Sequence, residues 1–221
     1  MDFERARLNM IEQQIRTWDV LDQDILDLLL VVRREDFVPA AWRAMAFTDM
    51  DIPLTLPEGP TGESMFPPKL EARVLQHLAV RRHEHVLEVG TGSGYLAALL
   101  AHRARRVLSC EIHPGLAAFG AANLRRAGVR NATVETADGA HPPGNDPFDV
   151  IVLAGSVGIV PHDLLARLNP GGRLFAIVGQ APAMTAQLIT RTGDDAFTTE
   201  NLFETDARRL RGFPEKERFV F

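Results

Sequence analysis

Three glycines at alternate positions form the first candidate binding element of the sequence. Gly90, Gly92 and Gly94 follow an apolar run at residues 86–89 and precede a helical pattern that begins at Tyr95. Glycine lets a backbone adopt positive φ and approach a ligand closely, and the first N–H groups of a helix are free to bind one. A strand, a glycine-rich turn and a helix in this order therefore predict a nucleotide-like ligand.

The side chains around the glycines argue against the two common phosphate-binding loops. A dinucleotide-binding fingerprint requires Gly or Ala at the position of Tyr95. A P-loop requires Lys followed by Ser or Thr after its last glycine, and that pair is absent here. Glu88, two residues before Gly90, would repel a pyrophosphate, whereas it could orient an ammonium or a sulfonium group.

Carboxylates follow the next two predicted strands as well. Glu111 ends the second strand, about twenty residues after the glycines, where a carboxylate can accept both hydroxyls of a ribose. Asp138 comes just after the third strand, in a position to accept from the exocyclic amine of an adenine. Ribose, adenine and a positively charged amino-acid tail together describe S-adenosylmethionine, which is the predicted cofactor.

The elements that position these residues alternate between strands and helices. Apolar runs without polar alternation indicate strands buried on both faces, and intervening helices require parallel crossovers. The pattern predicts an α/β fold with a doubly wound, mostly parallel sheet. The predicted strands are residues 86–89, 107–110, 132–135, 150–153 and 174–178, with helices at 95–104, 116–127 and 162–168. Two C-terminal antiparallel strands, 186–192 and 197–203, complete the prediction.

The first 80 residues have a different texture. Apolar spacing predicts a helix over residues 3–15 and a second helix, capped by Asp19 or Asp22, that runs through Val32 and ends before Pro39. Residues 49–68 are crowded with proline and glycine and are predicted as a long, functional loop, followed by a helix at 69–78. We therefore expect an N-terminal helical extension with a substrate loop at 1–80 and a cofactor-binding domain at 81–221.

Composition limits the class of protein and its partners. The 221 residues are 46% hydrophobic and carry a net charge of -5, so the chain can close a core but has no overall attraction to nucleic acid or anionic lipid. Cys110, the single cysteine, is interpreted as a small buried hydrophobe in a reducing compartment. No signal peptide or membrane-spanning run is recognised, which predicts a cytoplasmic protein, with a monomer favoured.

Several blocks resemble a known family. The glycine block at 86–95 resembles the class I, Rossmann-like S-adenosylmethionine-dependent methyltransferases. Residues 32–39 and 51–54 resemble the N-terminal signature of the protein-L-isoaspartate O-methyltransferases more specifically, and residues 169–174 resemble the turn into the fifth strand. The resemblance implies that the chain esterifies the α-carboxylate of L-isoaspartyl residues in damaged proteins, with isoaspartyl-containing peptides or proteins as substrates.

The resemblance also implies which residues form the site. Ser64 matches the Thr of a family loop that reads Gly-x-Thr-Ile-Ser-x-Pro, whereas Phe66 replaces the Ser that is implicated in the active site. Either Ser64 takes over this role, the site is remodelled for another acceptor, or the repair activity is reduced. Ser64 is the predicted catalytic residue. The predicted cofactor contacts are Glu88, Gly90, Thr91, Gly92, Gly94, Tyr95, Glu111, Ile112, Asp138 and Gly139.

The chemistry of the acceptor decides what else the site needs. An α-carboxylate, with a pKa of about 3.5, is ionised at neutral pH and requires no general base, whereas a phenol would require a base or a metal. The seven histidines show no metal-ligand spacing, so no metal is expected. Arg208, Arg209 and Arg211 either steer an anionic acceptor or solvate a surface, and the second interpretation is the simpler.

Four other activities are alternatives to this one. A nucleic-acid amine methyltransferase would carry an Asn/Asp-Pro-Pro-Tyr motif where residues 153–157 read Leu-Ala-Gly-Ser-Val. A serine hydrolase built on Ser156 would need Gly at the position of Ala154. A methyltransferase acting on a small molecule, favoured by Phe66, and a cofactor-binding module without turnover stay open as alternatives.

Overall fold

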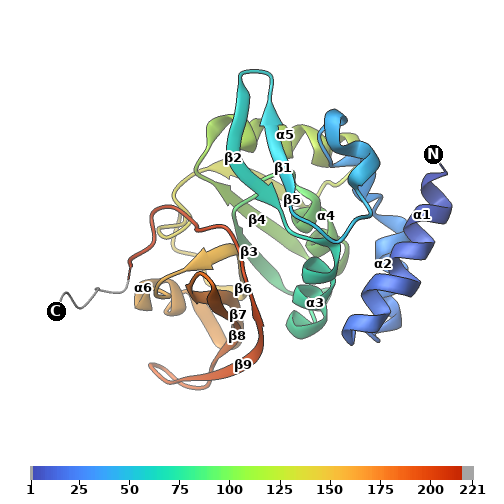
Figure 1. Cartoon of the computed structure of the whole chain (residues 1–221). Helices are drawn as coiled ribbons and strands as arrows, with labels where there is room; N and C mark the ends of the chain where they lie inside the picture. Colours follow the sequence, from blue (N-terminus) through green and yellow to red (C-terminus); the bar gives the residue numbers. More distant parts are fainter. Residues whose placement is uncertain (1, 216–221) are drawn as a thin grey trace.

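A seven-stranded sheet is the centre of the computed structural model, which describes residues 2–215 (Figure 1). Its strand order is β5-β4-β3-β6-β7-β8-β9. The five strands from β5 to β7 are parallel, whereas β8 and β9 add antiparallel pairs at one edge. The bounds are β3 (His85–Val89), β4 (Arg106–Glu111), β5 (Ala132–Thr136), β6 (Phe148–Val157), β7 (Leu168–Gln180), β8 (Ala183–Arg191) and β9 (Phe197–Thr205). The predicted sheet is confirmed.

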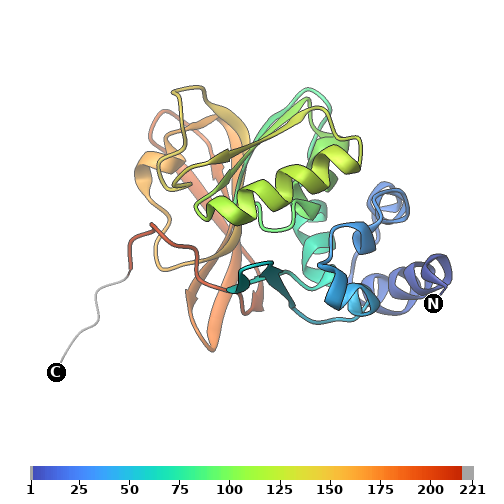
Figure 2. The same ribbon diagram turned by 90° about the horizontal axis from the view of Figure 1, so that it is seen from above.

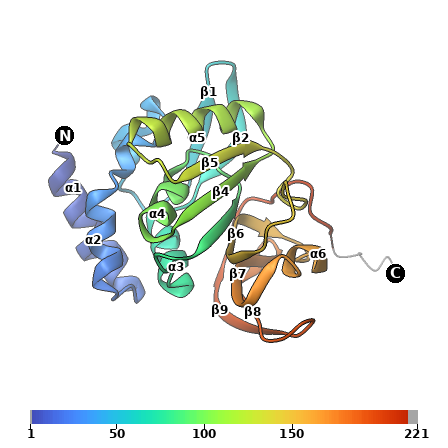
Figure 3. The ribbon, with the colours of Figure 1, turned by 180° about the vertical axis from the view of Figure 1, so that it is seen from behind.

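The order of the strands reverses between β3 and β6. From β3 the chain moves outward through α4 (Tyr95–Arg103) to β4 and through α5 (Pro114–Arg126) to β5, then returns to β6 on the other side of β3. A short α6 (His162–Leu165) connects β6 to β7. In open α/β sheets, ligands bind outside the carboxyl ends of the strands at such a reversal. Figure 3 shows α4 and α5 beside β4 and β5, and α6 beside β7.

The helices before the sheet pack on the same core. α1 (Phe3–Met10) continues through a π-helical turn (Ile11–Ile15) and a 3₁₀ turn (Arg16–Trp18), so the predicted helix over residues 3–15 is irregular in its second half. α2 (Gln23–Val31) begins at Asp22, whose side chain accepts from the N–H of Asp24, as predicted. Two 3₁₀ segments (Arg34–Asp36 and Ala40–Met45) follow.

The predicted loop at residues 49–68 contains a β-hairpin, so the prediction of an irregular loop was wrong. β1 (Ile52–Leu56) pairs antiparallel with β2 (Gly59–Met65) as a separate two-stranded sheet. Pro53 and Pro60 can occupy this sheet because proline is tolerated in edge strands, where its missing N–H costs no ladder bond. Figures 1 and 2 show the hairpin extending away from the body of the molecule, next to α5 and the C-terminal segment.

α3 (Pro68–Leu78) connects this hairpin to β3. Its buried face packs against α2, α4 and β7. One continuous hydrophobic cluster includes Met10, Leu29, Leu75, Val86 and Leu99, so the N-terminal helices and the sheet share a core. The division into units at 1–80 and 81–221 stays a prediction, and its ends at residues 1 and 216–221 lie outside the described residues. No helix among residues 2–215 is long and apolar enough to cross a membrane.

Candidate active site

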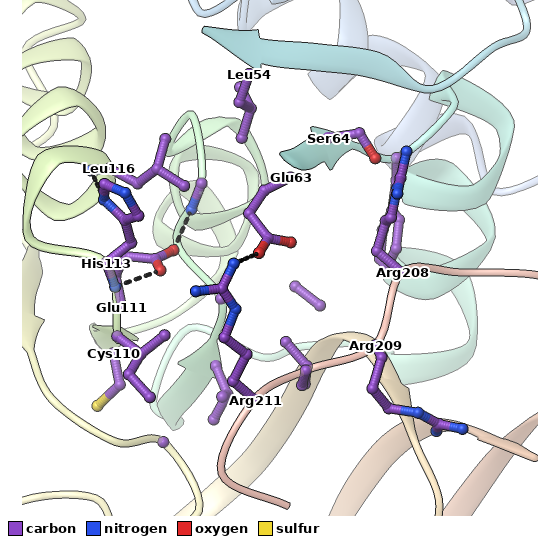
Figure 4. Close-up of a pocket in the computed structure, with 18 residues that line it drawn as sticks. Leu54, Glu63, Ser64, Cys110, Glu111, His113, Leu116, Arg208, Arg209 and Arg211 are labelled. Carbon is purple, nitrogen blue, oxygen red and sulfur yellow. Dashed lines mark hydrogen bonds and ion pairs between the residues drawn. The ribbon is translucent and has the colours of Figure 1, made fainter. Parts of the chain in front are cut away.

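A cavity of about 700 Å³ opens at the carboxyl ends of β3 and β4, at the reversal of strand order (Figure 4). The wall is formed by the glycine loop, the end of β4, the start of α5, the β1–β2 hairpin and the C-terminal segment at residues 206–215, together with Gly139 after β5 and Ala154 of β6. Its wall includes Leu54, Glu63, Ser64, Phe66, Gly90, Gly92, Glu111, Ile112, His113, Leu116, Gly139, Arg208, Leu210 and Arg211.

The glycine loop adopts conformations that other residues would strain. Gly90, Gly92 and Gly94 have φ of +96°, +50° and +81°. A Cβ on Gly94 would lie 2.9 Å from the carbonyl oxygen of Gly120, so α4 and α5 can approach each other only with glycine there. The loop is also tied to the sheet, since the N–H of Gly90 donates to the carbonyl of Cys110 at 2.8 Å.

Glu111 connects the end of β4 to this loop. Its Oε2 accepts from the N–H of Gly92 at 2.9 Å, and its Oε1 accepts from the N–H of His113 at 3.0 Å. Both bonds are drawn in Figure 4. Each carboxylate oxygen has a second lone pair, so the side chain can still accept hydroxyl hydrogens from a ribose in the cavity.

Glu88 is placed differently from its predicted role. Its side chain is fully buried behind the loop and does not line the cavity. The hydroxyl of Ser109 donates to Glu88 Oε2, and Ser109 lies 2.6 Å from Thr91 Oγ1. Burial raises the pKa of Glu88 to about 8, although the hydrogen bond from Ser109 acts to lower this pKa. The hydrogen bonds that link Glu88, Ser109 and Thr91 support the glycine loop from behind. A direct contact between Glu88 and the cofactor stays a prediction.

The other predicted cofactor residues divide into two groups. Ile112 and Gly139 line the cavity with Gly90, Gly92 and Glu111. Tyr95 does not, because its ring is 1% exposed and packs against Phe37, with ring centroids 5.4 Å apart.

Asp138 lies next to the cavity but not in its wall. Its Oδ1 accepts from the N–H of Ala140 at 3.0 Å. A Cβ on Gly212 would come within 2.5 Å of this carboxylate, which therefore packs against the C-terminal segment. The contacts predicted for Tyr95, Thr91, Gly94 and Asp138 stay predictions.

The hairpin brings the predicted catalytic residue to the same cavity. Ser64 lies in β2, and its hydroxyl lies 3.4 Å from Asp51 Oδ2. Phe66, two residues later, also lines the wall. Arg34 fixes this part of the chain: its fully buried guanidinium donates to the carbonyl of Phe66 at 2.6 Å and forms an ion pair with Glu71. Sequence patterns did not identify Arg34, since buried arginines are rare.

The C-terminal segment closes one side of the cavity and was not predicted as part of the site. The N–H of Ser156 donates to the carbonyl of Arg208 at 2.7 Å, and the N–H of Leu210 donates back to Ser156 at 2.9 Å. Arg211 then forms a 2.7 Å ion pair with Glu63 of β2. A sequence signal was present in Gly155, where a Cβ would lie 2.8 Å from the Leu210 side chain.

The chemistry of the site follows from what its wall contains. Cys110 is 1% exposed, and burial raises the pKa of its thiol to about 12, in agreement with its interpretation as a small hydrophobe. Within residues 2–215, no three His, Cys, Asp or Glu side chains are grouped so that they could hold a metal ion. The site offers backbone N–H groups, a carboxylate and a serine hydroxyl, which can bind and orient two reactants.

Comparisons with known proteins agree with this architecture. The protein-L-isoaspartate(D-aspartate) O-methyltransferase (PCMT) family matches residues 5–206. The chain is 37% identical over 192 residues to the protein-L-isoaspartate O-methyltransferase of Methanoculleus marisnigri, which covers 86% of this chain and 84% of that protein. It is 34% identical over 203 residues to protein-L-isoaspartate O-methyltransferase 1 of Syntrophobacter fumaroxidans, with 91% and 92% covered.

A solved structure shares the fold. A crystal structure from Plasmodium falciparum, assigned as a protein-L-isoaspartate O-methyltransferase and in complex with S-adenosyl-L-homocysteine, aligns with a TM-score of 0.79 at 18% identity. The alignment covers 96% of this chain and 99% of that one. The predicted family and fold are thereby confirmed. The chain belongs to the protein-L-isoaspartate(D-aspartate) O-methyltransferase family.

Proposed function

We propose that the chain transfers a methyl group from S-adenosylmethionine to the α-carboxylate of L-isoaspartyl residues in proteins. The observation that carries this proposal is a single cavity lined both by the glycine loop with Glu111 and by Ser64 of the hairpin. The names of the relatives support the acceptor. In such a cavity a cofactor on the loop and an acceptor beside the hairpin can meet.

The cofactor end of the cavity suits an adenosyl group. We propose that the backbone of Gly90 and Gly92 approaches the amino-acid tail and that Glu111 accepts the ribose hydroxyls. Asp138 or the backbone at Gly139 would receive the adenine amine. Glu111 supports this assignment because both of its oxygens are already held by backbone N–H groups, which fixes their orientation toward the cavity.

The reaction requires little acid–base catalysis from the protein. When bound, S-adenosylmethionine supplies a methyl group on a positively charged sulfur that leaves as a neutral thioether. The acceptor carboxylate is already ionised at neutral pH, so no side chain has to remove a proton. The chain's own contribution is to place the carboxylate oxygen in line with the methyl carbon and to exclude water. Ser64 can donate to the second carboxylate oxygen and fix its orientation.

Paired peptides test this proposal. The purified chain is incubated with methyl-labelled S-adenosylmethionine and two peptides that differ only in Asp versus isoAsp at one position. We expect label on the isoAsp peptide alone. Equal labelling of the two peptides, or labelling of neither, would overturn the assignment.

A small-molecule acceptor is the second candidate, and Phe66 favours it. Phe66 lines the cavity at the position where the resemblance places a Ser, and its ring cannot hydrogen-bond a carboxylate. If the chain is silent toward isoAsp peptides and Phe66→Ser gains that activity, the small-molecule acceptor is supported. If the unaltered chain labels the isoAsp peptide, Phe66 is compatible with repair. Cofactor binding without methyl transfer to any acceptor in a cell extract would instead identify a non-catalytic module.

We further propose that the chain acts as a cytoplasmic monomer that binds neither nucleic acid nor membranes. A net charge of -5 and one buried, reduced cysteine support this. Light scattering during size-exclusion chromatography and fractionation of cells that express the chain test the two parts of the proposal. A dimer mass would contradict the first part, and recovery with membranes or nucleic acid would contradict the second.

A further inference from the structure

Arg208 occupies the boundary between the cavity and the groove that leads away from it. Among residues 2–215, only Arg208 and Arg209 line both the cavity and a second, open groove, whose wall also includes Asp51, Met184, Asp206 and Glu215. A peptide acceptor must reach the cofactor from outside, and this groove meets the cavity at the two arginines, near Asp51, which lies 3.4 Å from the Ser64 hydroxyl. A side chain at that boundary can contact an acceptor that enters the cavity through the groove.

The two arginines differ in how they are engaged. Arg209 forms a 3.0 Å ion pair with Glu215 and donates to the carbonyl of Gly179 at 2.7 Å. Arg208 has no side-chain hydrogen bond or ion pair within residues 2–215, and its side chain is exposed. Figure 4 shows Arg208 directed toward Ser64, whereas Arg209 points away from the cavity. Arg208 is therefore the cation that can receive a ligand there.

The backbone of Arg208 is nevertheless fixed. Its carbonyl accepts from the N–H of Ser156 at 2.7 Å, and Leu210 donates back to Ser156 at 2.9 Å. Ser156 is fully buried at the end of β6. The base of the side chain is thus held by the sheet, while the guanidinium extends into the open boundary.

The charges around the Arg208 guanidinium favour reversible binding of an anion. Asp51, which lies 3.4 Å from the Ser64 hydroxyl, has its pKa raised by burial, and the charges of Arg208 and Arg34 act in the opposite direction. Asp206 adds a second negative charge nearby. An incoming carboxylate therefore competes with Asp51 for Arg208 and for the Ser64 hydroxyl, which favours exchange over permanent capture.

We propose that the Arg208 guanidinium, together with the Ser64 hydroxyl, binds the acceptor carboxylate and selects an anionic acceptor. This inference rests on the proposed function. Guanidinium groups match the planar carboxylate and can bind it through two N–H donors. Arg208 thereby supplies a polar contact at the end of the cavity where Phe66 offers none.

The test compares binding of two peptides in the presence of saturating S-adenosylhomocysteine, so that no reaction occurs. Both contain isoAsp, one with a free α-carboxylate and one with an α-carboxamide, and affinity is measured by fluorescence anisotropy. We expect the unaltered chain to prefer the carboxylate by roughly 10- to 100-fold, the range for a hydrogen bond to a charged group. Arg208→Gln should abolish the preference while leaving the affinity for the carboxamide unchanged.

Two variants serve as controls. Arg208→Lys keeps the charge and should retain part of the preference, and Arg82→Gln, an exposed arginine far along the chain, should retain all of it. The S-adenosylhomocysteine affinity should be equal in every variant, which verifies the fold.

Two results overturn the role of Arg208. One is an unchanged preference in Arg208→Gln, and the other is an equal loss of affinity for both peptides, as a merely structural role would produce. If the unaltered chain methylates the isoAsp peptide in either case, only this inference fails. If it neither binds nor methylates that peptide, the proposed function fails and the inference fails with it.

Discussion

The carboxylate of Glu111 accepts a 2.9 Å hydrogen bond from the backbone N–H of Gly92, which ties the end of β4 to the glycine loop after β3. A neutral amide at this position accepts with one oxygen only, so Glu111→Gln loses either the loop contact or a ribose contact. We expect the dissociation constant for S-adenosylhomocysteine to rise by roughly 10- to 100-fold, as for the loss of charge-assisted hydrogen bonds. Isothermal titration calorimetry measures it.

Glu135→Gln is the matched control for this variant. Glu135 lies on β5, is exposed and does not line the cavity, so the same change of charge should leave the affinity unaltered. An equal affinity in Glu111→Gln and in the unaltered chain would contradict the assignment of Glu111.

The buried carboxyl group of Glu88 predicts a pH dependence of stability. Burial raises its pKa from 4.5 to about 8, so the folded state holds a proton that the unfolded state releases. This contribution is fully present below pH 4.5 and is lost as the pH rises through about 8. Between pH 6 and pH 9 the loss in unfolding free energy should be on the order of 2–3 kcal/mol.

Urea unfolding at several pH values checks this expectation. Glu88→Gln cannot release a proton, so its unfolding free energy should fall less over the same range, and the difference between the two proteins should grow from about pH 4.5 to about pH 8. Parallel pH profiles for Glu88→Gln and the unaltered chain would show that Glu88 is ionised in the folded protein.

Two glycines with similar backbone conformations allow the cost of backbone strain to be distinguished from the cost of close packing. Gly94 and Gly128 have φ of +81° and +73°, but only at Gly94 would a Cβ meet backbone, 2.9 Å from the Gly120 carbonyl oxygen. We expect Gly128→Ala to lower the unfolding free energy by about 1–2 kcal/mol, and Gly94→Ala by about 2–4 kcal/mol, because overpacking adds to the strain. Chemical denaturation measures both. Equal losses would mean that the α4–α5 contact adjusts without cost.

The ion pair between Arg211 and Glu63 joins the C-terminal segment to β2 across the cavity. Exposed pairs contribute roughly 0.2–1 kcal/mol, so Glu63→Gln should barely change overall stability. We expect the dissociation rate of S-adenosylhomocysteine to rise about two- to five-fold, because the pair holds two walls of the cavity together. Stopped-flow displacement of a fluorescent analogue measures this rate, with Glu58→Gln at the exposed hairpin turn as control. Identical rates in the two variants would show that the pair does not restrain the ligand.

The central sheet was predictable because its signals are local. The apolar runs of β3, β4 and β6 and the glycines after β3 are each contained within a few residues of sequence. Glu111 was found for the same reason, since a carboxylate at a strand end is visible without knowledge of its partners.

The errors arise where tertiary contacts decide the structure. Pro53, Pro60 and the glycines of residues 59–62 indicate a loop, yet the pairing of β1 with β2 and the burial of Ile52 and Leu54 produce a hairpin. The predicted helix at 162–168 is limited to α6 (His162–Leu165), because Leu168 is already part of buried β7.

The C-terminal wall of the cavity depends on distant contacts in the same way. Arg208 joins it through a hydrogen bond from the N–H of Ser156, 52 residues earlier in the chain, to the Arg208 carbonyl. No local pattern in the arginines of residues 208–211 distinguishes a cavity wall from a solvated surface.

The location of the transferred methyl group tests the central claim most directly. A peptide with one isoAsp residue and several other carboxyl groups is reacted with the purified chain and S-adenosylmethionine, and the product is fragmented in a mass spectrometer. The proposed function predicts one added methyl group, on the isoAsp residue, which alkali removes as methanol. A methyl group on any other side chain, or neither a methylated peptide nor released methanol at any time point, would contradict it.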